Sequence, residues 1–408
     1  VSLIKVQLEF EPDVTGITKV RYDDDAWGQE DLFNALQDVR LVSPQGAAIE
    51  INKDSSWIQI NHNRKNGPLV LEYFLKQDFS LEEQPTESYR PIIQPQYFHL
   101  FSHNFFVVPE SWASDSQATR RVFLSWKGFP ADYIIHNSFG SQERAQQLND
   151  ISLEDFHSAI FVGGDYQLRE GDIKGNRVVL AVRGEWIPFD ETEVFDVLMQ
   201  TLRAQRTFWE DHSQPYFTVT LRPLIVEGGS SFQGTGLTNS FAWSISNNEE
   251  TEISQLIYLF NHELQHNWTG RTIQNANEDE QYWFSEGFTD YYTWKNISKH
   301  KIGGMDDSFF IDQLNEAIRN LYSSPVVAAP NSEINYDNFW ANPDYGKLPY
   351  YRGAVYAFLV DNWIINKTNG KRSLDDLMLE LLQAANKEGV KISNSYWMMK
   401  LEAVLGSE

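Results

Sequence analysis

Cysteine is absent from the 408 residues of this chain. Without a thiol the protein can form no disulfide, use no cysteine nucleophile and bind no zinc through sulfur. Long hydrophobic runs are missing too, because no stretch of about eighteen consecutive apolar residues occurs, which excludes an ordinary membrane-spanning helix. The first residues, from Val1, read as a strand and not as a signal peptide, and we expect a periplasmic or extracellular location.

Basic residues are scarce relative to acidic ones. Lys and Arg number 33 against 57 Asp and Glu, which gives a formal net charge of −24. Such a charge argues against nucleic acid or an anionic membrane as a partner. The acids are spread along the chain, so they favour solubility, and they also attract cationic substrates such as peptides with free amines. The oligomeric state is left open.

The first 185 residues or so predict mainly short strands separated by turns, with one short helix near 142–148. Apolar residues make up 41% of the chain, which is enough to bury the cores of two domains at this length. The strands are predicted from alternating apolar and polar residues, at Lys5 to Phe10, Trp57 to Ile60, Leu69 to Phe74, Arg121 to Trp126 and Val178 to Val182.

The pattern changes near residue 186. A helix is predicted at 191–209 and strands at 216–226 and 237–245, and beyond residue 249 almost every segment has helical spacing. The predicted helices are 250–266, 284–300, 308–322, 346–366, 373–386 and 395–405, with an ordered loop at 324–345. This order predicts an α+β fold with a β-rich N-terminal domain, 1–186, and a mostly helical catalytic domain, 187–408.

The strongest motif of the chain is His262-Glu263-Leu264-Gln265-His266, an H-E-x-x-H sequence inside a predicted helix. Two histidines four residues apart share one helical face, so both imidazoles can bind the same ion. The glutamate between them can contact a water on that ion without being a ligand. The pattern indicates the centre of a zinc peptidase.

A surface helix with two solvated histidines is the alternative interpretation of this motif. The surrounding residues favour a partly buried helix, because Asn248 offers an N-cap and acids fill the first turn. Apolar residues then recur at helical spacing, at Ile253, Leu256, Ile257, Phe260 and Leu264. Buried charge of this kind needs a partner, which a divalent metal provides.

A catalytic zinc site takes three protein ligands and leaves one position for water. We predict Glu286 as the third ligand, on the next helix. Asp290 lies four residues later on the same face and can accept a hydrogen bond from a ligand histidine. A solvated acidic pair is the alternative. The rival ligands, Glu278, Asp279 and Glu280, lie in a polar run that reads as a loop, which is a less rigid platform.

H-E-x-x-H followed by Ser285-Glu286-Gly287 resembles the gluzincin peptidases, in particular families M1 and M61. Nineteen residues, 267–285, separate the second histidine from the glutamate, whereas M1 enzymes usually have eighteen. Trp268 and Gly270 still look like the M1 pattern. The segment 348–353 resembles the Y-x-K-G segment of both families, with Arg352 in place of lysine. This resemblance implies that Tyr350 stabilises the tetrahedral intermediate, with Tyr351 as the second choice.

Family M61 is the better match. Residues 228–237 occupy the place of its glycine-rich substrate strand, and 97–110 and 136–140 resemble segments of its N-terminal domain. In this interpretation the glycines let the following strand expose an edge to which an extended peptide can pair. A flexible hairpin turn is the alternative. The substrate-binding residues implied are Gly228, Gly229, Gly234, Gly236 and Asn239.

The resemblance implies a thermolysin-like catalytic domain with one Zn²⁺ per chain, a peptide substrate and aminopeptidase activity. One departure concerns the acid that grips the free amine of the substrate. Related aminopeptidases place a glutamate after the glycine pair, where this chain has Ser230, Ser231 and Phe232, and the nearest acid is Glu227. A zinc endopeptidase or related hydrolase, and an inactive gluzincin-fold binding protein, therefore stay open as alternatives.

Overall fold

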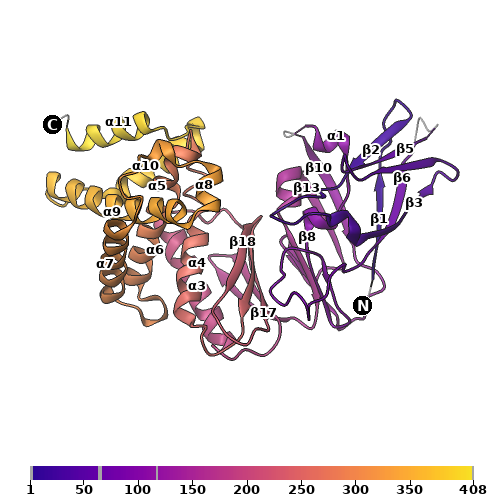
Figure 1. The fold of residues 1–408 in the computed structure, drawn as a ribbon, viewed down its shortest axis with the longest axis horizontal. Coiled ribbons are helices and arrows are strands. Elements are labelled where there is room, and N and C mark those ends of the chain that lie inside the picture. The colour runs from indigo at the N-terminus through magenta and orange to yellow at the C-terminus, as the bar shows by residue number, and fades with distance from the viewer. Residues whose placement is uncertain (1–2, 63–66, 116–117, 407–408) are drawn as a thin grey trace. The chain divides into compact units, whose positions relative to one another are not determined.

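The computed structural model describes residues 3–62, 67–115 and 118–406. Their contacts divide the chain into two compact units (Figure 1). Unit 1 contains residues 1–191 and 214–251, and unit 2 contains 192–213 and 252–408. The order of elements, strands first and helices after, confirms the predicted α+β class with a β-rich N-terminal region.

Unit 1 begins with three small antiparallel sheets. Their strand orders are β1-β6-β3, β4-β5-β2-β9 and β10-β13. The members are β1 (Ile4–Phe10), β2 (Ile17–Arg21), β3 (Leu36–Ser43), β4 (Ala48–Asn52), β5 (Trp57–Asn61), β6 (Leu69–Leu75), β9 (Val108–Pro109), β10 (Thr119–Ser125) and β13 (Ala145–Ser152). Short helical turns join them, namely η1 (Leu32–Ala35), η2 (Ser102–Asn104), α1 (Glu110–Ala113) and α2 (Leu153–His157). One apolar core runs through these sheets and includes Val6, Ile58, Leu71 and Leu124.

The predicted helix at 142–148 is wrong, because most of this segment belongs to strand β13. Its residues pair antiparallel with β10 from Ala145↔Ser125 to Ser152↔Thr119. Cross-strand hydrogen bonding decides the conformation of such a short polar run, whose own sequence has only a weak preference. The predicted strands near residues 5, 57, 69, 121 and 178 are confirmed.

Two five-stranded sheets complete unit 1. The first has the order β12-β11-β14-β8-β7 and the second β15-β16-β17-β19-β18. The strands of the first are β7 (Ile92–Ile93), β8 (Tyr97–Phe101), β11 (Ile134–Asn137), β12 (Gly140–Ser141) and β14 (Ile160–Gly164). Those of the second are β15 (Gln167–Ile173), β16 (Asn176–Val182), β17 (Tyr216–Leu224), β18 (Phe232–Leu237) and β19 (Ser240–Ser246).

The second sheet explains why the chain crosses between the units three times, after residues 191, 213 and 251. Strands β17 and β19 lie beyond the predicted domain boundary at residue 186, yet β17 pairs in parallel with β16. This ladder holds 214–251 to unit 1. The predicted division into domains at 186 and 187 stays a prediction, while the compact units follow the hydrogen bonding of the sheet.

The glycine-rich segment forms the edge strand β18 itself. The predicted strand 237–245 is in fact the end of β18, a turn at Thr238 and Asn239, and strand β19. Asn239 has a left-handed φ of 51°, which the short polar asparagine tolerates. Because β18 folds back along β19, it covers the edge that we expected to be exposed. Gly234 is needed there, since an added Cβ would lie 2.0 Å from the Trp243 ring.

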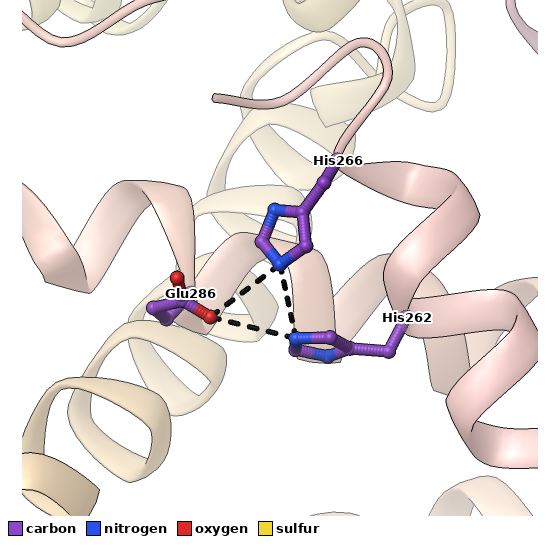
Figure 2. A group of neighbouring side chains, drawn as sticks. All are labelled: His262, His266 and Glu286. Carbon is purple, nitrogen blue, oxygen red and sulfur yellow. Dashed lines mark hydrogen bonds and ion pairs between the residues drawn. The ribbon is translucent and has the colours of Figure 1, made fainter. Parts of the chain in front are cut away.

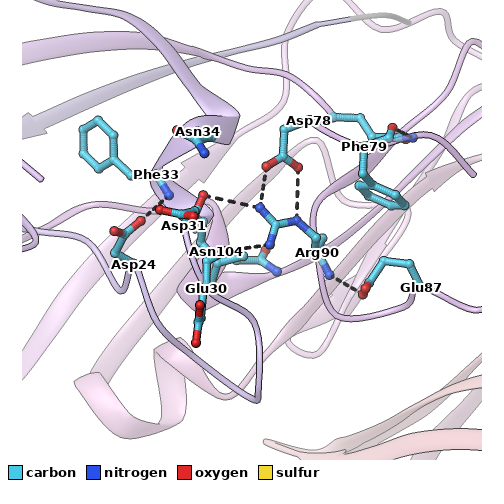
Figure 3. A network of polar contacts seen from close by, with 12 residues as sticks. Asp24, Glu30, Asp31, Phe33, Asn34, Asp78, Phe79, Glu87, Arg90 and Asn104 are labelled. Carbon is cyan, nitrogen blue, oxygen red and sulfur yellow. Dashed lines mark hydrogen bonds and ion pairs between the residues drawn. The ribbon is translucent and has the colours of Figure 1, made fainter. Parts of the chain in front are cut away.

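Arg90 joins two segments of unit 1 that are distant in sequence (Figure 3). Its guanidinium donates to Asp78 and to the backbone carbonyls of Glu30 and Asp31. The backbone N–H of Arg90 donates to Glu87 at 3.1 Å. The hydrogen bond to Asp78, together with the charges of Asp78 and Glu87, raises the pKa of Arg90. A cation with this many acceptors holds the loops 24–34 and 78–90 in place.

Unit 1 also buries neutral histidines. His136 is enclosed between Ser141 and Thr218, and the ring of His103 packs 4.1 Å from that of Trp27. Burial lowers the pKa of each to about 3. An unfolded chain protonates these rings below about pH 6.5, whereas the folded chain does not. The stability that these two histidines contribute therefore falls as the pH drops from 6.5 toward 3.

We expect the free energy of unfolding in urea to be lower at pH 5.0 than at pH 7.5. Each of these two histidines should contribute about 2 kcal/mol to the loss, by proton linkage. The variant His103→Phe keeps a ring beside Trp27 but cannot titrate, so its pH slope should be flatter by about one proton. Equal stability at both pH values, or an unchanged slope in the variant, would contradict this account.

Unit 2 is helical. Its elements are α3 (Glu191–Phe208), α4 (Ile253–Gln265), α5 (Glu278–Ser285), α6 (Gly287–His300), η3 (Ile302–Gly304), α7 (Asp307–Ser323), η4 (Asn331–Glu333), α8 (Tyr336–Ala341), α9 (Pro343–Lys367), α10 (Leu374–Glu388) and α11 (Asn394–Leu405). Most predicted helices are confirmed to within a few residues. The predicted loop 324–345 contains η4 and α8, which pack Ile334 and Phe339 against Tyr282 and Leu348. None of the helices in the described ranges is long and apolar enough to cross a membrane.

Candidate metal centre

Helix α4 carries the two histidines of the H-E-x-x-H motif. It begins at Ile253, not near residue 250, because Glu252 and Gln255 form a capping box that satisfies two backbone N–H groups. The predicted N-cap, Asn248, instead accepts the N–H of Glu250 within a turn. Leu256, Ile257, Phe260 and Leu264 are buried as predicted, which fixes the rotation of the helix.

A buried asparagine beside the first histidine fixes α4 further. Asn261 donates to the hydroxyl of Thr201 at 3.0 Å, and its backbone carbonyl accepts from Gln205 at 2.7 Å, both on α3. Its side-chain oxygen accepts from Asn296 of α6 at 2.6 Å. Three helices thus meet at the residue before His262. One sequence signal for this role exists, since Asn261 is a polar residue in an apolar helical stretch.

Glu286 lies at a break between two helices. The predicted single helix 284–300 is two helices, since α5 ends at Ser285 and α6 begins at Gly287. The predicted loop at 275–281 likewise contains the first turn of α5, whose three acids favour a helix N-terminus. At the break Glu286 has φ −98° and ψ −48°, and its side chain lies beside both histidines.

The three predicted ligands meet at one point (Figure 2). His262 Nε2 and His266 Nε2 are 3.1 Å apart, and Glu286 Oε2 lies 3.4 Å and 3.6 Å from them. Donors on a tetrahedron with bonds of 2.0 to 2.1 Å are about 3.3 Å apart. The residues therefore fit zinc in type, number and spacing. Within the described part of the chain, these three form the group of possible ligands whose donor atoms lie within 4.8 Å.

The electrostatics of the centre favour a bound cation. Burial alone would lower the pKa of His262, but Asp290 and Glu286 outweigh it and raise that pKa to about 10. His266 shows the same balance, with Glu286 as the main partner that raises its pKa. Burial would raise the pKa of Glu286, yet the two histidines hold it well below its usual range. Two carboxylates thus face two imidazoles in a largely buried space.

Each histidine is oriented by a second partner. His262 Nδ1 lies 2.8 Å from Asp290 Oδ1, the contact that we predicted. Tyr258, one helical turn before His262, donates to the same carboxylate oxygen at 2.5 Å. His266 Nδ1 faces the carbonyl of Thr269 at 3.1 Å. Partners of this kind fix the ring orientation and leave both Nε2 atoms for the metal. Sequence reasoning missed Tyr258, although its spacing places it on the face of His262.

Tyr350 lies at the centre, as the family resemblance implied. Its ring stacks on that of His262 with centroids 6.0 Å apart, and its hydroxyl interacts with Glu286. Burial, followed by the charge of Glu286, raises the pKa of this phenol, so it is a proton donor at neutral pH. Glu263 is close enough for its charge to act on both Tyr350 and His266. The second choice, Tyr351, interacts with Asn320 and Glu316 of α7.

Two glycines set the approach of the helices that carry Glu286 and Tyr350. A Cβ added to Gly287 would lie 2.3 Å from Gly353 Cα, and one added to Gly353 would lie 2.0 Å from the carbonyl oxygen of Trp283. Helix α9 therefore crosses the α5 and α6 pair in backbone contact. Gly287, directly after Glu286, and Gly353, three residues after Tyr350, therefore have a packing role. The motifs alone did not reveal it.

The other predicted residues have different surroundings. Glu278, a rival ligand, accepts hydrogen bonds from Ser285 and from Asn275, the latter at 2.9 Å. Arg352 holds the segment 327–331 through Asn331 Oδ1 and the carbonyls of Val327 and Ala329. The predicted substrate-binding residues 228–239 belong to unit 1, where Gly229 N–H donates to Glu250 at 3.0 Å. Their role in substrate binding stays a prediction.

Comparison with known proteins agrees with this site. The family model described as M61 glycyl aminopeptidase matches residues 255–338. The segment that carries the three possible metal ligands is therefore similar to family M61. The M61 match covers α4 through α8, with both histidines and Glu286, and confirms the resemblance predicted from the motifs. No curated protein matches the chain.

Solved structures share the fold. An aminopeptidase N family protein from Idiomarina loihiensis aligns with a TM-score of 0.77 and 16% identity, over 100% of this chain and 72% of that one. An M1 zinc metallopeptidase from Deinococcus radiodurans aligns with a TM-score of 0.51 and 14% identity, over 99% of this chain and 87% of that one. A two-domain M1 zinc metallopeptidase variant bound to L-arginine gives 0.50 and 14%, over 99% and 86%. Because the sequence identities are only 14 to 16%, the structural similarity establishes the fold alone.

Removing the carboxylate behind His262 is expected to weaken zinc binding. We expect Asp290→Asn to lower zinc affinity about 10- to 100-fold, because the histidine loses the partner that holds its orientation and basicity. Tyr258→Phe should lower it less, since Asp290 remains. Competition with a chromogenic chelator measures both. If either variant bound zinc as tightly as the wild type, the orienting role of that residue would be refuted.

Proposed function

We propose that this protein is a zinc-dependent peptidase of the M61 type, with His262, His266 and Glu286 as the ligands of one zinc ion per chain. The observation that carries the proposal is the spacing of 3.1, 3.4 and 3.6 Å among the three donor atoms. Bound zinc supplies a polarised carbonyl and a water whose pKa is lowered to about 7. The match of residues 255–338 to a peptidase family supports the same conclusion.

Two side chains would handle protons and charge in peptide hydrolysis. Glu263 follows His262 directly and is only half buried, so it can take a proton from the attacking water and pass it to the leaving amine. Tyr350, a phenol with a raised pKa, would donate a hydrogen bond to the developing oxyanion. Asp290 and the carbonyl of Thr269 would hold the two imidazoles throughout. This division of roles explains why each of these residues is present.

The proposed activity is that of an aminopeptidase, as in the family whose model matches. An endopeptidase is the second candidate. It is favoured by one observation, that Ser230, Ser231 and Phe232 follow the glycine pair where related aminopeptidases have a glutamate for the substrate amine. Recognition of a free amine in the first case must use another group, whereas an endopeptidase requires none.

A paired peptide panel separates the candidates. Each peptide is offered with a free amino end and with an acetylated one, to the zinc-loaded protein and to the chelated protein. An aminopeptidase cleaves the free peptides alone and only with zinc present. Equal cleavage of blocked peptides would assign endopeptidase activity. Zinc binding without cleavage of any peptide would overturn the proposal and favour a binding protein built on a peptidase fold.

A further inference from the structure

Unit 2 contains a cavity of about 360 Å³ that the proposed reaction does not use. Helix α9 forms one wall, and α5, η4 and α11 complete it. The lining residues are Trp283, Asn331, Arg352, Gly353, Tyr356, Asn394, Trp397 and Met398. Its volume lies within the usual range of small-molecule sites, and aromatic rings with a few polar groups are their usual lining.

The part of the cavity at Arg352 lies on a different side of α9 from Tyr350. Arg352 follows Tyr350 by two residues, which turns it by about 200° around the helix axis. No lining residue is a metal ligand, nor does any orient one. Trp283 and Gly353 form the backbone contact between α5 and α9, so the floor of the cavity is rigid. A ligand there would be bound separately from the peptide at the zinc.

The charge of the lining comes from Arg352. No aspartate or glutamate lines the cavity, and in the described ranges Arg352 makes no ion pair. Three of its five N–H groups donate to Asn331, Val327 and Ala329, which leaves two for a ligand. Burial, with no acid against it, lowers the pKa of this guanidinium, which stays charged.

The aromatic side chains of the lining determine which chemical groups the uncharged part of the ligand can have. Trp283 and Trp397 are 7% and 2% exposed, and the indole N–H of Trp397 is already bound to the hydroxyl of Tyr356 at 3.0 Å. They therefore present apolar surface. Asn331 and Asn394 add carboxamides near Arg352. Apolar walls with one unpaired cation match a molecule that has an apolar body and one negative group.

We propose that this cavity is a binding site for a small carboxylate with an aromatic or branched apolar body, of the size of one amino-acid residue. Its carboxylate pairs with Arg352, and its body packs between Trp283, Trp397 and Met398. No residue of this site is a zinc ligand, so its experimental test is independent of the test of the proposed peptidase activity.

Calorimetric titration with N-acetyl-L-phenylalanine tests this assignment, with its uncharged carboxamide as the matched ligand. For a ligand of about fifteen non-hydrogen atoms, we expect a Kd of roughly 0.5 mM. The amide should bind at least about tenfold more weakly because it lacks the charge. Titrations on the full chain before and after chelation should agree, since no lining residue is a ligand. Binding that disappears on chelation would belong to the metal centre and would overturn the proposal.

Two neighbouring methionines of α11 provide a matched pair of variants. Met398 lines the cavity and is 47% exposed, whereas Met399 is 52% exposed and does not line it. Both tolerate a polar group at no cost to the core. We expect Met398→Glu to weaken binding about tenfold or more by repelling the carboxylate, and Met399→Glu to change it less than twofold. No binding up to 10 mM ligand, roughly twentyfold above the expected Kd, or equal effects of both variants, would refute the site.

Discussion

Replacing Glu263 by glutamine is expected to lower kcat for peptide hydrolysis by about a thousandfold while leaving zinc binding intact. General acid and base catalysis contributes about a hundredfold to ten-thousandfold in enzymes of this kind, and glutamine cannot accept the proton of the attacking water. Glu263 is not among the three clustered ligands, so the metal should remain. Glutamine has nearly the same shape as glutamate, so the half-buried position of Glu263 should accept it.

The matched control is Glu316→Gln, which removes one acid from an exposed position of α7 in the same unit. It should keep both zinc and activity within about twofold, because Glu316 is exposed and solvent and salt screen exposed charges. Steady-state kinetics with a peptide that the wild type cleaves, and zinc content by mass spectrometry, give both readouts. Normal turnover by Glu263→Gln would remove Glu263 from the mechanism, and loss of zinc would make it a structural residue.

The second large effect is expected at Glu286. The change Glu286→Gln should lower zinc affinity more than about a hundredfold, because loss of a ligand costs more than the loss of an orienting partner. Activity should fall with it at any zinc concentration that leaves the site empty. The carboxamide also removes the negative charge that balances the buried histidines, whose raised pKa values depend on that carboxylate.

Glu280→Gln serves as the comparison for that experiment. Glu280 belonged to the rival acids of the sequence-based prediction, and it lies within α5, outside the group of three. It should bind zinc as the wild type does. A chelator competition assay distinguishes the two variants directly. Wild-type affinity in Glu286→Gln, or a matching loss in Glu280→Gln, would assign the third ligand elsewhere.

Much of this centre could be predicted because its information is local. The spacing of His262 and His266 fixes their shared helical face, and Asp290, four residues after Glu286, shares the face of that residue. The structure places these four side chains together as predicted. The helix boundaries were less accurate, since the break at Glu286 depends on how α5 and α6 pack against α9. The helix is capped by Glu252 and Gln255 and not by Asn248, which accepts the N–H of Glu250 within a turn before the helix.

Long-range pairing is what the sequence could not reveal. The polar segment 145–152 has no strong local preference and becomes a strand only through β10. Strand β18 pairs along β19 through a hairpin that turns at Asn239. The free edge of the sheet is therefore that of β18 and not, as expected, that of β19. The hydrogen bond from Asn261 to Thr201 joins residues that are distant in sequence. The backbone contact between Gly287 and Gly353 does the same. Each follows from tertiary contacts that no periodicity encodes.

We propose that His262 Nε2, His266 Nε2 and Glu286 Oε2 bind one zinc ion. The most direct measurement is a crystal structure of the zinc-loaded chain with anomalous data collected on both sides of the zinc absorption edge. We expect one peak in unit 2 within about 2.0 to 2.2 Å of each of these three atoms. A zinc peak held by other residues, or none at this centre, would contradict it.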